Sequence, residues 1–178
     1  FFAACIMFVT YVTGSDRALR IMRWLIGGLR ELYEFRTLAI SAVLVAIITG
    51  WLWMQGRTLN LLATGDDAAE RTGVDVRRVR ISLFVVASLV TAIAVSISGP
   101  IGFVGLIIPH ILRMVIGPDH RVLLPAAALF GGAFLAVADT TASVIHDVPL
   151  PVGLVTAFVG GPFFVVLMKT RDRSGHGF

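Results

Sequence analysis

Residues Leu59–Val76 read LNLLATGDDAAERTGVDV, an extended polar insertion between two long apolar runs. The stretch predicts a short, well-bounded helix. Thr64 is expected to be its N-cap, with Asp67 three residues on completing a capping box. Gly73 stands where a left-handed C-terminal cap favours glycine. The charges suit the helix dipole, because acidic residues fill the first turn and Arg71 stands in the last.

Composition places this insertion in a membrane protein. Hydrophobic residues make up 57% of the 178 and charged residues 15%, and the mean hydropathy is +0.89. These values are typical of a chain that crosses a membrane several times, and not of a water-soluble domain. The net charge of +4 would also suit nucleic-acid binding. The basic residues, however, stand at the ends of apolar runs, where they hold a chain at the membrane surface, so no nucleic-acid partner is expected.

The apolar runs predict an all-α fold, a polytopic membrane helical bundle with about six spanning segments. Phe1–Val12 is expected to be the end of a first, partial span, and the chain to be the C-terminal part of a longer protein. Residues 1–178 are expected to form a single transmembrane domain. A short interfacial helix is expected within Ser15–Arg36, ended by Gly27 and Gly28. The other predicted spans are Leu38–Met54, Ile81–Ser98, Ile101–Gly117, Val122–Ala138 and Val152–Met168.

The basic residues also predict an orientation. If every span crosses, ten of the 15 Lys and Arg residues fall on the side that holds the 59–76 loop and the C-terminus. The loop and the C-terminus are therefore expected in the cytoplasm, where basic residues accumulate. The count depends on Ile101–Gly117 crossing fully, and Pro109 within it leaves a kinked or re-entrant segment open. The five residues on the opposite side are Arg17, Arg20, Arg23, Arg30 and Arg36.

A second informative stretch, Ser98–Arg113, reads SGPIGFVGLIIPHILR. Its glycines recur every three residues, which favours close backbone contact, and its prolines interrupt helical hydrogen bonding. His110 is either a proton relay or substrate ligand, or a structural histidine bonded to backbone near the proline, and the structural role is favoured. Arg113 is expected to reach lipid headgroups. This helix-break and packing motif comprises Gly99, Pro100, Gly102, Gly105, Pro109, His110 and Arg113.

This motif, with GPDHRVLLP at Gly117–Pro125 and LPVGLVTAFVGGPFF at Leu150–Phe164, resembles the FecCD family. Members are permease subunits of ABC importers for iron–siderophore complexes, haem and vitamin B12. The resemblance runs from about Leu59 to Met168. It implies a permease of the bacterial plasma membrane with an iron–siderophore complex as the first-choice substrate, haem or vitamin B12 being the alternatives. The implied partners are a dimer of ATP-binding subunits, a second permease subunit and an extracytoplasmic substrate-binding protein.

Within the polar insertion, Asp67–Gly73 is similar to the EAA-xxx-G loop of importer permeases, with aspartate in place of glutamate. In that family the loop docks into a groove of the ATP-binding subunit. The resemblance therefore implies that residues 59–76 form a cytoplasmic coupling helix and not merely a solvated connector. The residues expected to make this contact are Leu62, Thr64, Gly65, Asp66, Asp67, Ala68, Ala69, Glu70, Arg71 and Gly73.

The resemblance also implies a docking surface for the substrate-binding protein on the other side. Relatives tend to carry an arginine where this chain has Ser143. Arg17, Arg20 and Arg23 recur every third residue and can present one basic edge outward, so they are expected to supply part of that surface. The alternative is that they only hold their helix at the lipid headgroups.

The sequence contains no catalytic motif, since a phosphate loop, an HExxH pair and a Cys/His arrangement are all missing and the four histidines lack metal-ligand spacing. The chain is therefore expected to carry no catalytic, cofactor or metal site, and ATP hydrolysis is expected in a partner. The rival class is an ion-coupled secondary transporter with Asp139 or His110 as the coupling group. A third is a purely structural membrane subunit. A docking helix favours the importer, and copurification of an ATPase would separate the three.

Overall fold

The computed structural model describes residues 1–13, 15–29, 34–144 and 150–174, and the regular elements within them are helices. The predicted all-α fold is confirmed. In chain order the helices are α1 (Phe2–Thr13), α2 (Ser15–Ile26), α3 (Phe35–Met54), α4 (Gly56–Ala63), α5 (Asp66–Arg71), α6 (Val76–Ser98), α7 (Val104–Ile116), α8 (His120–Val144) and α9 (Val152–Ser174).

Three helices of the described chain, α3, α6 and α8, are long and apolar enough to cross a membrane. Two shorter apolar helices accompany them, α7 and the Val152–Val165 part of α9. The long helices continue beyond the predicted apolar runs. Helix α6 begins at Val76, where the apolar run begins at Ile81, because Asp75 caps it and its first turns carry arginines. Polar flanks therefore supply the length that the apolar runs lack.

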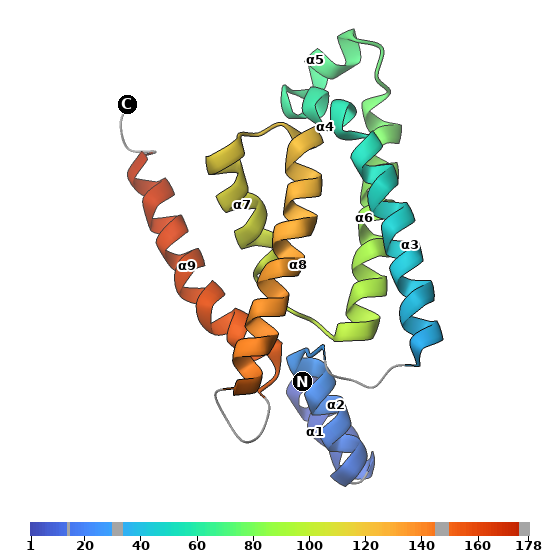
Figure 1. Ribbon diagram of the computed structural model, residues 1–178, viewed down its shortest axis with the longest axis vertical. Coiled ribbons are helices and arrows are strands. Elements are labelled where there is room, and N and C mark those ends of the chain that lie inside the picture. The colour runs from blue at the N-terminus through green and yellow to red at the C-terminus, as the bar shows by residue number, and fades with distance from the viewer. Residues whose placement is uncertain (14, 30–33, 145–149, 175–178) are drawn as a thin grey trace.

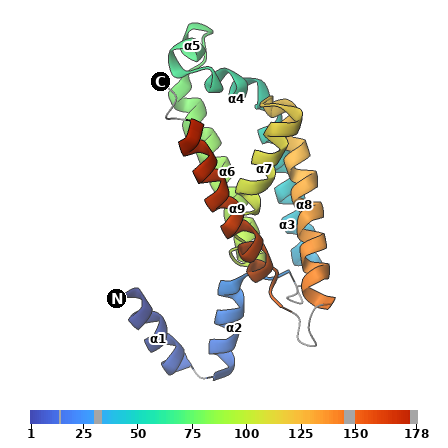
Figure 2. The same cartoon turned by 90° about the vertical axis from the view of Figure 1, so that its left-hand side faces the viewer.

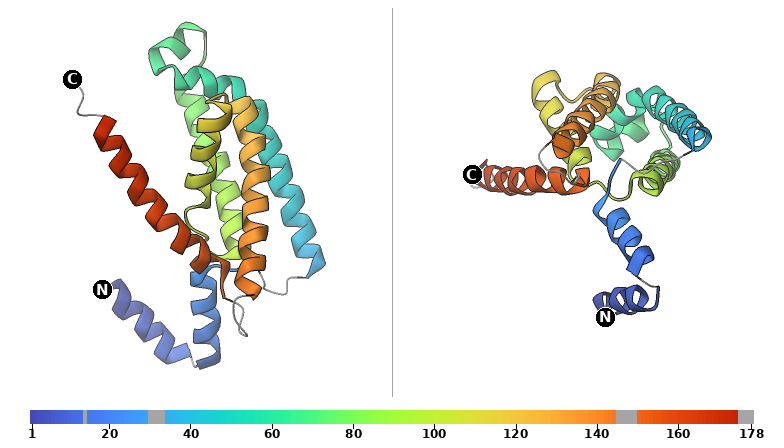
Figure 3. Two further views of the ribbon diagram at one scale, coloured as in Figure 1. Left: turned by 60° about the vertical axis from the view of Figure 1, so that its left-hand side comes forward. Right: turned by 60° about the horizontal axis from the view of Figure 1, so that its bottom comes forward.

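The long helices lie side by side, with α4 and α5 across one end of the bundle (Figure 1). We call this the α5 end. Helix α2 lies at the opposite end, the α2 end, and α1 projects outward from it (Figure 2). Helix α9 starts beside α8 at the α2 end and leans away from the other helices as it approaches the α5 end (Figure 3). The residue 59–76 loop and the described C-terminal helix end thus share one end of the molecule.

The described arginines divide between these two ends as the alternating topology predicts. Helices α4 and α5 carry Arg57 and Arg71 at the α5 end, where α7 ends and α8 begins. Helix α2, with its three arginines, lies at the other end, as does Arg36 at the start of α3. Arg30 lies outside the described residues. That the α5 end is the cytoplasmic one stays a prediction.

Most large apolar side chains point away from the bundle. Phe84, Leu129 and Phe158 are 74%, 74% and 82% exposed. In a chain that crosses a membrane, such faces meet lipid or further membrane helices, and helix packing does not require a water-excluding core. The small-residue stripe of Ala128, Gly132 and Ala136 on α8 is exposed as well.

Helix α7 does not cross a membrane by itself. Its 13 residues rise ~20 Å, less than the ~30 Å of a hydrocarbon core. The chain from Gly99 to Phe103 completes the connection from α6, and both of these residues have positive φ, 66° and 68°. Pro109 stays inside a continuous α7. The break in residues 98–113 therefore lies in the loop before α7 and not at Pro109.

Candidate functional site

The polar insertion folds as two helices, and the expected N-cap is wrong. Residues up to Ala63 belong to α4, and Thr64 is the C-cap of that helix, its hydroxyl donating to the Leu61 carbonyl at 2.7 Å. The N-cap of α5 is Gly65, with φ 114° and ψ 153°. The chain must turn sharply between two helices here, and glycine adopts such backbone angles without strain. Because the Thr64 hydroxyl is engaged by α4, the capping box with Asp67 does not form.

The C-terminal cap of α5 is confirmed. Gly73 has φ 86°. Its N–H donates to the Glu70 carbonyl at 2.9 Å, and the Val74 N–H donates to the Ala69 carbonyl at 3.4 Å. This pair of bonds is the Schellman arrangement, which satisfies the last carbonyls of a helix. Helix α5 is thus bounded by a glycine on each side.

The exposed surface of α5 is polar. Ala69 is fully buried and holds α5 against the rest of the loop, whereas Ala68 is exposed. The acidic residues fill the first turn and Arg71 the last, as predicted. A hollow of about 430 Å³ opens on this surface, lined by Thr64, Gly65, Asp66, Asp67, Ala68 and Arg71. Leu62, by contrast, is half-buried on α4. The loop therefore presents a polar rim around a hollow.

One ion pair joins α5 to α6. The Arg80 guanidinium lies 2.6 Å from the Asp66 carboxylate, with both side chains at least half exposed. Pairs of this kind contribute little, about 0–1 kcal/mol, and salt weakens them. Helix α6 has its own cap, since Asp75 accepts from the Arg78 N–H at 3.0 Å and pairs with its guanidinium at 2.9 Å.

A denser set of bonds joins α4 to the start of α8. The Asn60 amide nitrogen donates to Asp119 Oδ1 at 2.7 Å. The Asn60 Oδ1 accepts from the His120 backbone N–H at 2.9 Å and lies 2.8 Å from His120 Nδ1. Asp119 caps α8 by accepting from the Arg121 N–H at 2.9 Å. The amide of Asn60, followed by the Arg121 N–H, holds the pKa of Asp119 below its usual value.

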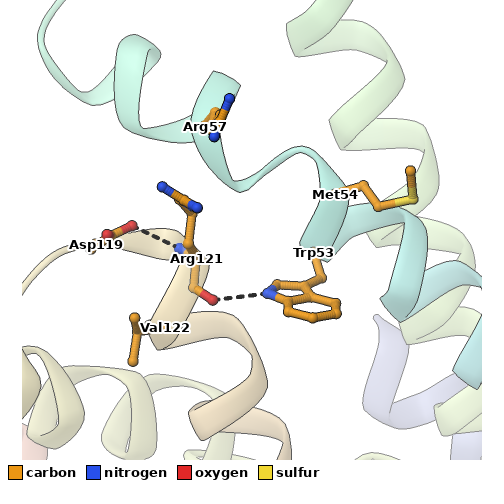
Figure 4. Close-up of a pocket in the computed structure, with 6 residues that line it drawn as sticks. All are labelled: Trp53, Met54, Arg57, Asp119, Arg121 and Val122. Carbon is orange, nitrogen blue, oxygen red and sulfur yellow. Dashed lines mark hydrogen bonds between the residues drawn. The ribbon is translucent and has the colours of Figure 1, made fainter.

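The first turn of α4 also fits closely on α8. Gly56 is buried, and a Cβ there would lie 3.0 Å from Arg121 Cγ. The Trp53 indole N–H, at the end of α3, donates to the Arg121 carbonyl at 2.8 Å. Beside this contact lies a hollow of about 570 Å³, onto which Arg57 and Arg121 face (Figure 4). Its lining residues are Trp53, Met54, Arg57, Asp119, Arg121 and Val122.

At the α2 end, the C-terminus of α2 is joined to two other helices through backbone. Helix α2 ends at Ile26, and Gly27 follows with φ 79°, as the sequence predicts. The Gly28 N–H donates to the Ser98 carbonyl of α6 at 2.8 Å, and the Gly153 N–H of α9 donates to the Gly27 carbonyl at 3.2 Å. Close approach here requires glycine, since a Cβ on Gly153 would overlap the Ile26 carbonyl. Arg17, Arg20 and Arg23 are exposed on α2.

The glycines of the 98–113 motif do not act alike. Gly99 lies against the last turn of α2, with the close backbone contact that was predicted. Gly102 and Gly105 face open space in the described chain. Phe103 instead makes a close contact that the sequence did not indicate, its ring lying on the buried Gly160 of α9. Pro100 is exposed at the start of the loop.

His110 and Arg113 point to different surroundings. The His110 ring meets the edge of Phe163 on α9, with ring centroids 6.4 Å apart at 73°. Arg113 is exposed in the last turn of α7. Among the described residues no hydrogen bond of the His110 ring was found, so the bond to backbone near Pro109 that we expected is replaced by an aromatic contact. Ser143, on α8, donates to the Thr140 carbonyl at 2.6 Å.

Comparison with known proteins gives one consistent result. The model of the FecCD transport family matches residues 1–170. A cobalamin import system permease protein, BtuC, of Halobacterium salinarum is 48% identical over 164 residues, 90% of this chain and 43% of that protein. The hemin transport system permease protein HmuU of Yersinia pestis is 40% identical over 97% of this chain and 52% of its own length. The vitamin B12 import system permease protein BtuC of Vibrio vulnificus is 39% identical over 93% and 51%.

A solved structure matches as well. An ABC transporter described as of the metal-chelate type, in an inward-facing conformation, superposes with a TM-score of 0.84 and 30% identity. The match covers 95% of this chain and 55% of that one. The chain thus spans about half the length of the curated relatives it matches.

Proposed function

The chain belongs to the FecCD transport family, and from that premise we propose that it forms part of the membrane-spanning permease of an ATP-driven importer. ATP is hydrolysed by a partner subunit, and the permease carries no catalytic residue. The observation that carries the proposal is α5, a short helix bounded by two glycines and held at one end of the bundle with a polar exposed surface. Such a helix has little apolar area of its own to bury and is available to a partner.

In this proposal α5 is the coupling helix and the ATP-binding subunit is its partner. The residues that meet the partner are those around the hollow, from Thr64 to Arg71. Leu62 and Ala69 support them from within. Gly65 and Gly73 fix where α5 begins and ends, so that a movement of the ATP-binding subunit displaces α5 as a unit. The α5 end then lies in the cytoplasm of the cell whose plasma membrane holds the protein, with the C-terminus on the same side.

For the substrate we propose a metal–tetrapyrrole chelate, cobalamin or haem. The named relatives transport cobalamin, hemin and vitamin B12, and the similar solved structure is described as metal-chelate type. These names favour haem or vitamin B12 over the iron–siderophore complex that the sequence suggested first. A second permease subunit completes the path, which the substrate follows by alternating access.

On the α2 end we propose that an extracytoplasmic substrate-binding protein docks near α2. Arg17, Arg20 and Arg23 are exposed there, and the chain after α2 is joined through Gly28 to α6 and through Gly27 to α9. Reversing all three charges to glutamate should slow association with the binding protein, most at low salt, where screening is weakest. Arg36→Glu at the same end is the control. An on-rate unchanged at both salt concentrations would leave the arginines with a role at lipid headgroups only.

Copurification and uptake test the main proposal. The full-length protein, expressed with its neighbouring genes, should bring down an ATP-binding subunit. In proteoliposomes supplied with the binding protein, ATP should drive uptake of labelled cobalamin or haem. Uptake of a labelled ferric siderophore should be much lower. Uptake driven by an ion gradient without ATP, and without a copurifying ATPase, would instead establish the secondary transporter. Higher ATP-driven uptake of the ferric siderophore would contradict the substrate assignment but not the importer proposal.

A further inference from the structure

We propose that Asn60 and Asp119 form a clamp that makes α8 the helix that moves with the coupling helix. The inference rests on the proposed function of α5. It adds a pair of positioning residues, separated by 59 positions in the sequence, that join α4 to the α7–α8 turn. We call Asn60, Asp119 and the His120 backbone N–H the α4–α8 clamp.

The clamp uses both ends of the Asn60 amide. Its nitrogen donates to Asp119 Oδ1 at 2.7 Å, and its oxygen accepts from the His120 N–H at 2.9 Å. The nitrogen needs an acceptor and the oxygen needs a donor, so these two bonds fix the orientation of the amide. Asp119 Oδ1 also accepts from the Arg121 N–H at 2.9 Å. Asp119, which accepts from Asn60, is therefore also the N-cap of α8. Helix α4 is thus bonded to a side chain that is itself held at the end of α8.

A second contact keeps α4 from pivoting about Asn60. Gly56, one turn earlier, is buried against Arg121. The Trp53 indole N–H donates to the carbonyl of the same arginine. Both ends of the first turn of α4 are thus fixed to the first turn of α8. Only Thr64 and Gly65 separate α4 from α5.

The competing connection, from α5 to α6, is weaker. It consists of the exposed Asp66–Arg80 pair and the chain itself. The first turns of both helices are packed, with Val76 of α6 5% and Leu123 of α8 3% exposed, so the difference lies in the polar bonds: Asn60 bonds the capped end of α8, whereas the bond to α6 is between two exposed side chains. Helix α8 packs on α7 and α9, and α7 meets α9 again through His110 and Phe163. A displacement of α5 that α4 transmits therefore reaches α8 and, through α8, the helices α7 and α9.

The donors and acceptors of the clamp predict which substitutions at positions 60 and 119 should impair it and which should not. Asn60→Asp places a second carboxylate against Asp119 and removes the donor, so it should disrupt the clamp. Asp119→Asn keeps an acceptor oxygen and a good N-cap, so it should do little. The double variant restores a donor at position 119 opposite an acceptor at position 60. It should therefore recover part of what Asn60→Asp loses, although it carries more substitutions. Recovery is incomplete because one atom, Asp119 Oδ1, accepts from both Asn60 and the Arg121 N–H, and an amide nitrogen in its place donates to position 60 but cannot accept from Arg121.

The test uses the full-length permease assembled with its ATP-binding subunit and binding protein in proteoliposomes. The measured quantity is substrate taken up per ATP hydrolysed. Asn60→Asp should lower this ratio at least about fivefold while the ATPase subunit still copurifies, and adding Asp119→Asn should raise it again by at least about twofold. The matched control is Asp75→Asn, which alters the equivalent cap of α6 without touching α4. Combined with Asn60→Asp, it should give no recovery.

Two results would overturn the clamp. One is uptake and ATP hydrolysis falling together, with the ratio unchanged, in Asn60→Asp. The other is recovery by Asp75→Asn as large as by Asp119→Asn. If Asn60→Asp does not assemble, Asn60→Ala, which removes the bonds without adding charge, is measured in its place by the same ratio. If the native complex shows no ATP-driven uptake, the proposed function fails, and the clamp is then judged by whether positions 60 and 119 couple in a thermal-unfolding double-mutant cycle.

Discussion

Replacing Gly65 with alanine is expected to loosen α5 without disturbing any packing contact. Gly65 has φ 114° and ψ 153°, and in the described part of the chain no heavy atom beyond its own neighbours Thr64 and Asp66 lies within 4 Å of the place its Cβ would take. The cost is therefore backbone strain alone. A residue with a side chain enters this region of backbone angles at ~1–3 kcal/mol.

The strain should appear as faster local opening of α5. The Ala69 N–H donates to the Gly65 carbonyl at 3.1 Å, and the Val74 N–H to the Ala69 carbonyl at 3.4 Å. These amides exchange with solvent when the helix opens, so their rates report its local stability. Strain of ~2 kcal/mol should raise their exchange roughly 30-fold, because ~1.4 kcal/mol is a factor of ten.

Hydrogen exchange of the peptide that covers 59–76, in the solubilised full-length protein, measures the effect. Gly73→Asn should accelerate exchange less than Gly73→Val, since asparagine tolerates the left-handed φ of 86° and a β-branched residue does not. Gly161→Ala, in the middle of α9 with open space at its Cβ, is the control and should leave the peptide unchanged. Unchanged exchange in Gly65→Ala, or equal acceleration by both Gly73 variants, would contradict the strain argument.

Three further predictions concern other parts of the molecule. Arg71→Glu, at the hollow on α5, should reduce copurification of the ATP-binding subunit, while Arg77→Glu, exposed outside the hollow, should not. The lowered pKa of Asp119 means that its charged form is favoured on folding, so the loss of melting temperature in Asp119→Ala should be full at about pH 7 and should shrink only as the pH falls below ~4, the usual pKa of the carboxyl group. A loss that grew with acidification would contradict this. Gly153→Ala should reduce the free energy of unfolding by ~1–3 kcal/mol, and so lower the melting temperature, because the new Cβ overlaps α2. Gly131→Ala places its Cβ in open space and should leave the melting temperature unchanged.

The sequence predicted the helical spans well because their signal is local and repeated. Each long apolar run became a helix, α2 ends before Gly27 as expected, and Gly73 has the positive φ that was expected of it. The helix starts were predicted less well. Helix α6 begins five residues before its apolar run, at Val76, because Asp75 caps a turn of arginines that hydropathy alone assigns to the loop.

The wrong cap at Thr64 shows where local reasoning ends. Thr64 followed by Asp67 has the spacing of a capping box, but the same hydroxyl can bond the helix before it or the helix after it. It bonds Leu61, in α4. The sequence did not reveal that α4 exists as a separate helix, since Gly56–Ala63 is only eight residues long and adjoins the apolar run of α3. The choice between the two helices is made by the turn at Gly65.

The α4–α8 clamp could not be predicted in the same way, because its partners are brought together only by the fold. Asp119 follows Gly117-Pro118 and precedes an apolar run, which is a recognisable N-cap position. Nothing local connects it to Asn60. The sequence indicates that Asp119 caps α8 and that its carboxylate can accept further hydrogen bonds. Only the fold shows that Asn60 is the residue that donates to it.

The loop before α7 depends both on local sequence signals and on packing between helices. Glycine and proline spacing predicted a break in residues 98–113, and a break exists, but its place is set by packing. Phe103 takes a positive φ, which few residues with side chains adopt, and its ring then lies on Gly160 of α9. Gly99 meets α2 at the other end of the loop. Non-helical backbone at membrane depth is tolerated where protein covers it, and α2 and α9 cover the two ends of this loop, at Gly99 and Phe103. The two ends of the molecule are thus connected through one group of helices. Helix α9 contacts α2 at the backbone of Gly27 and packs on α8, whose first turn is bonded to α4 through Asn60.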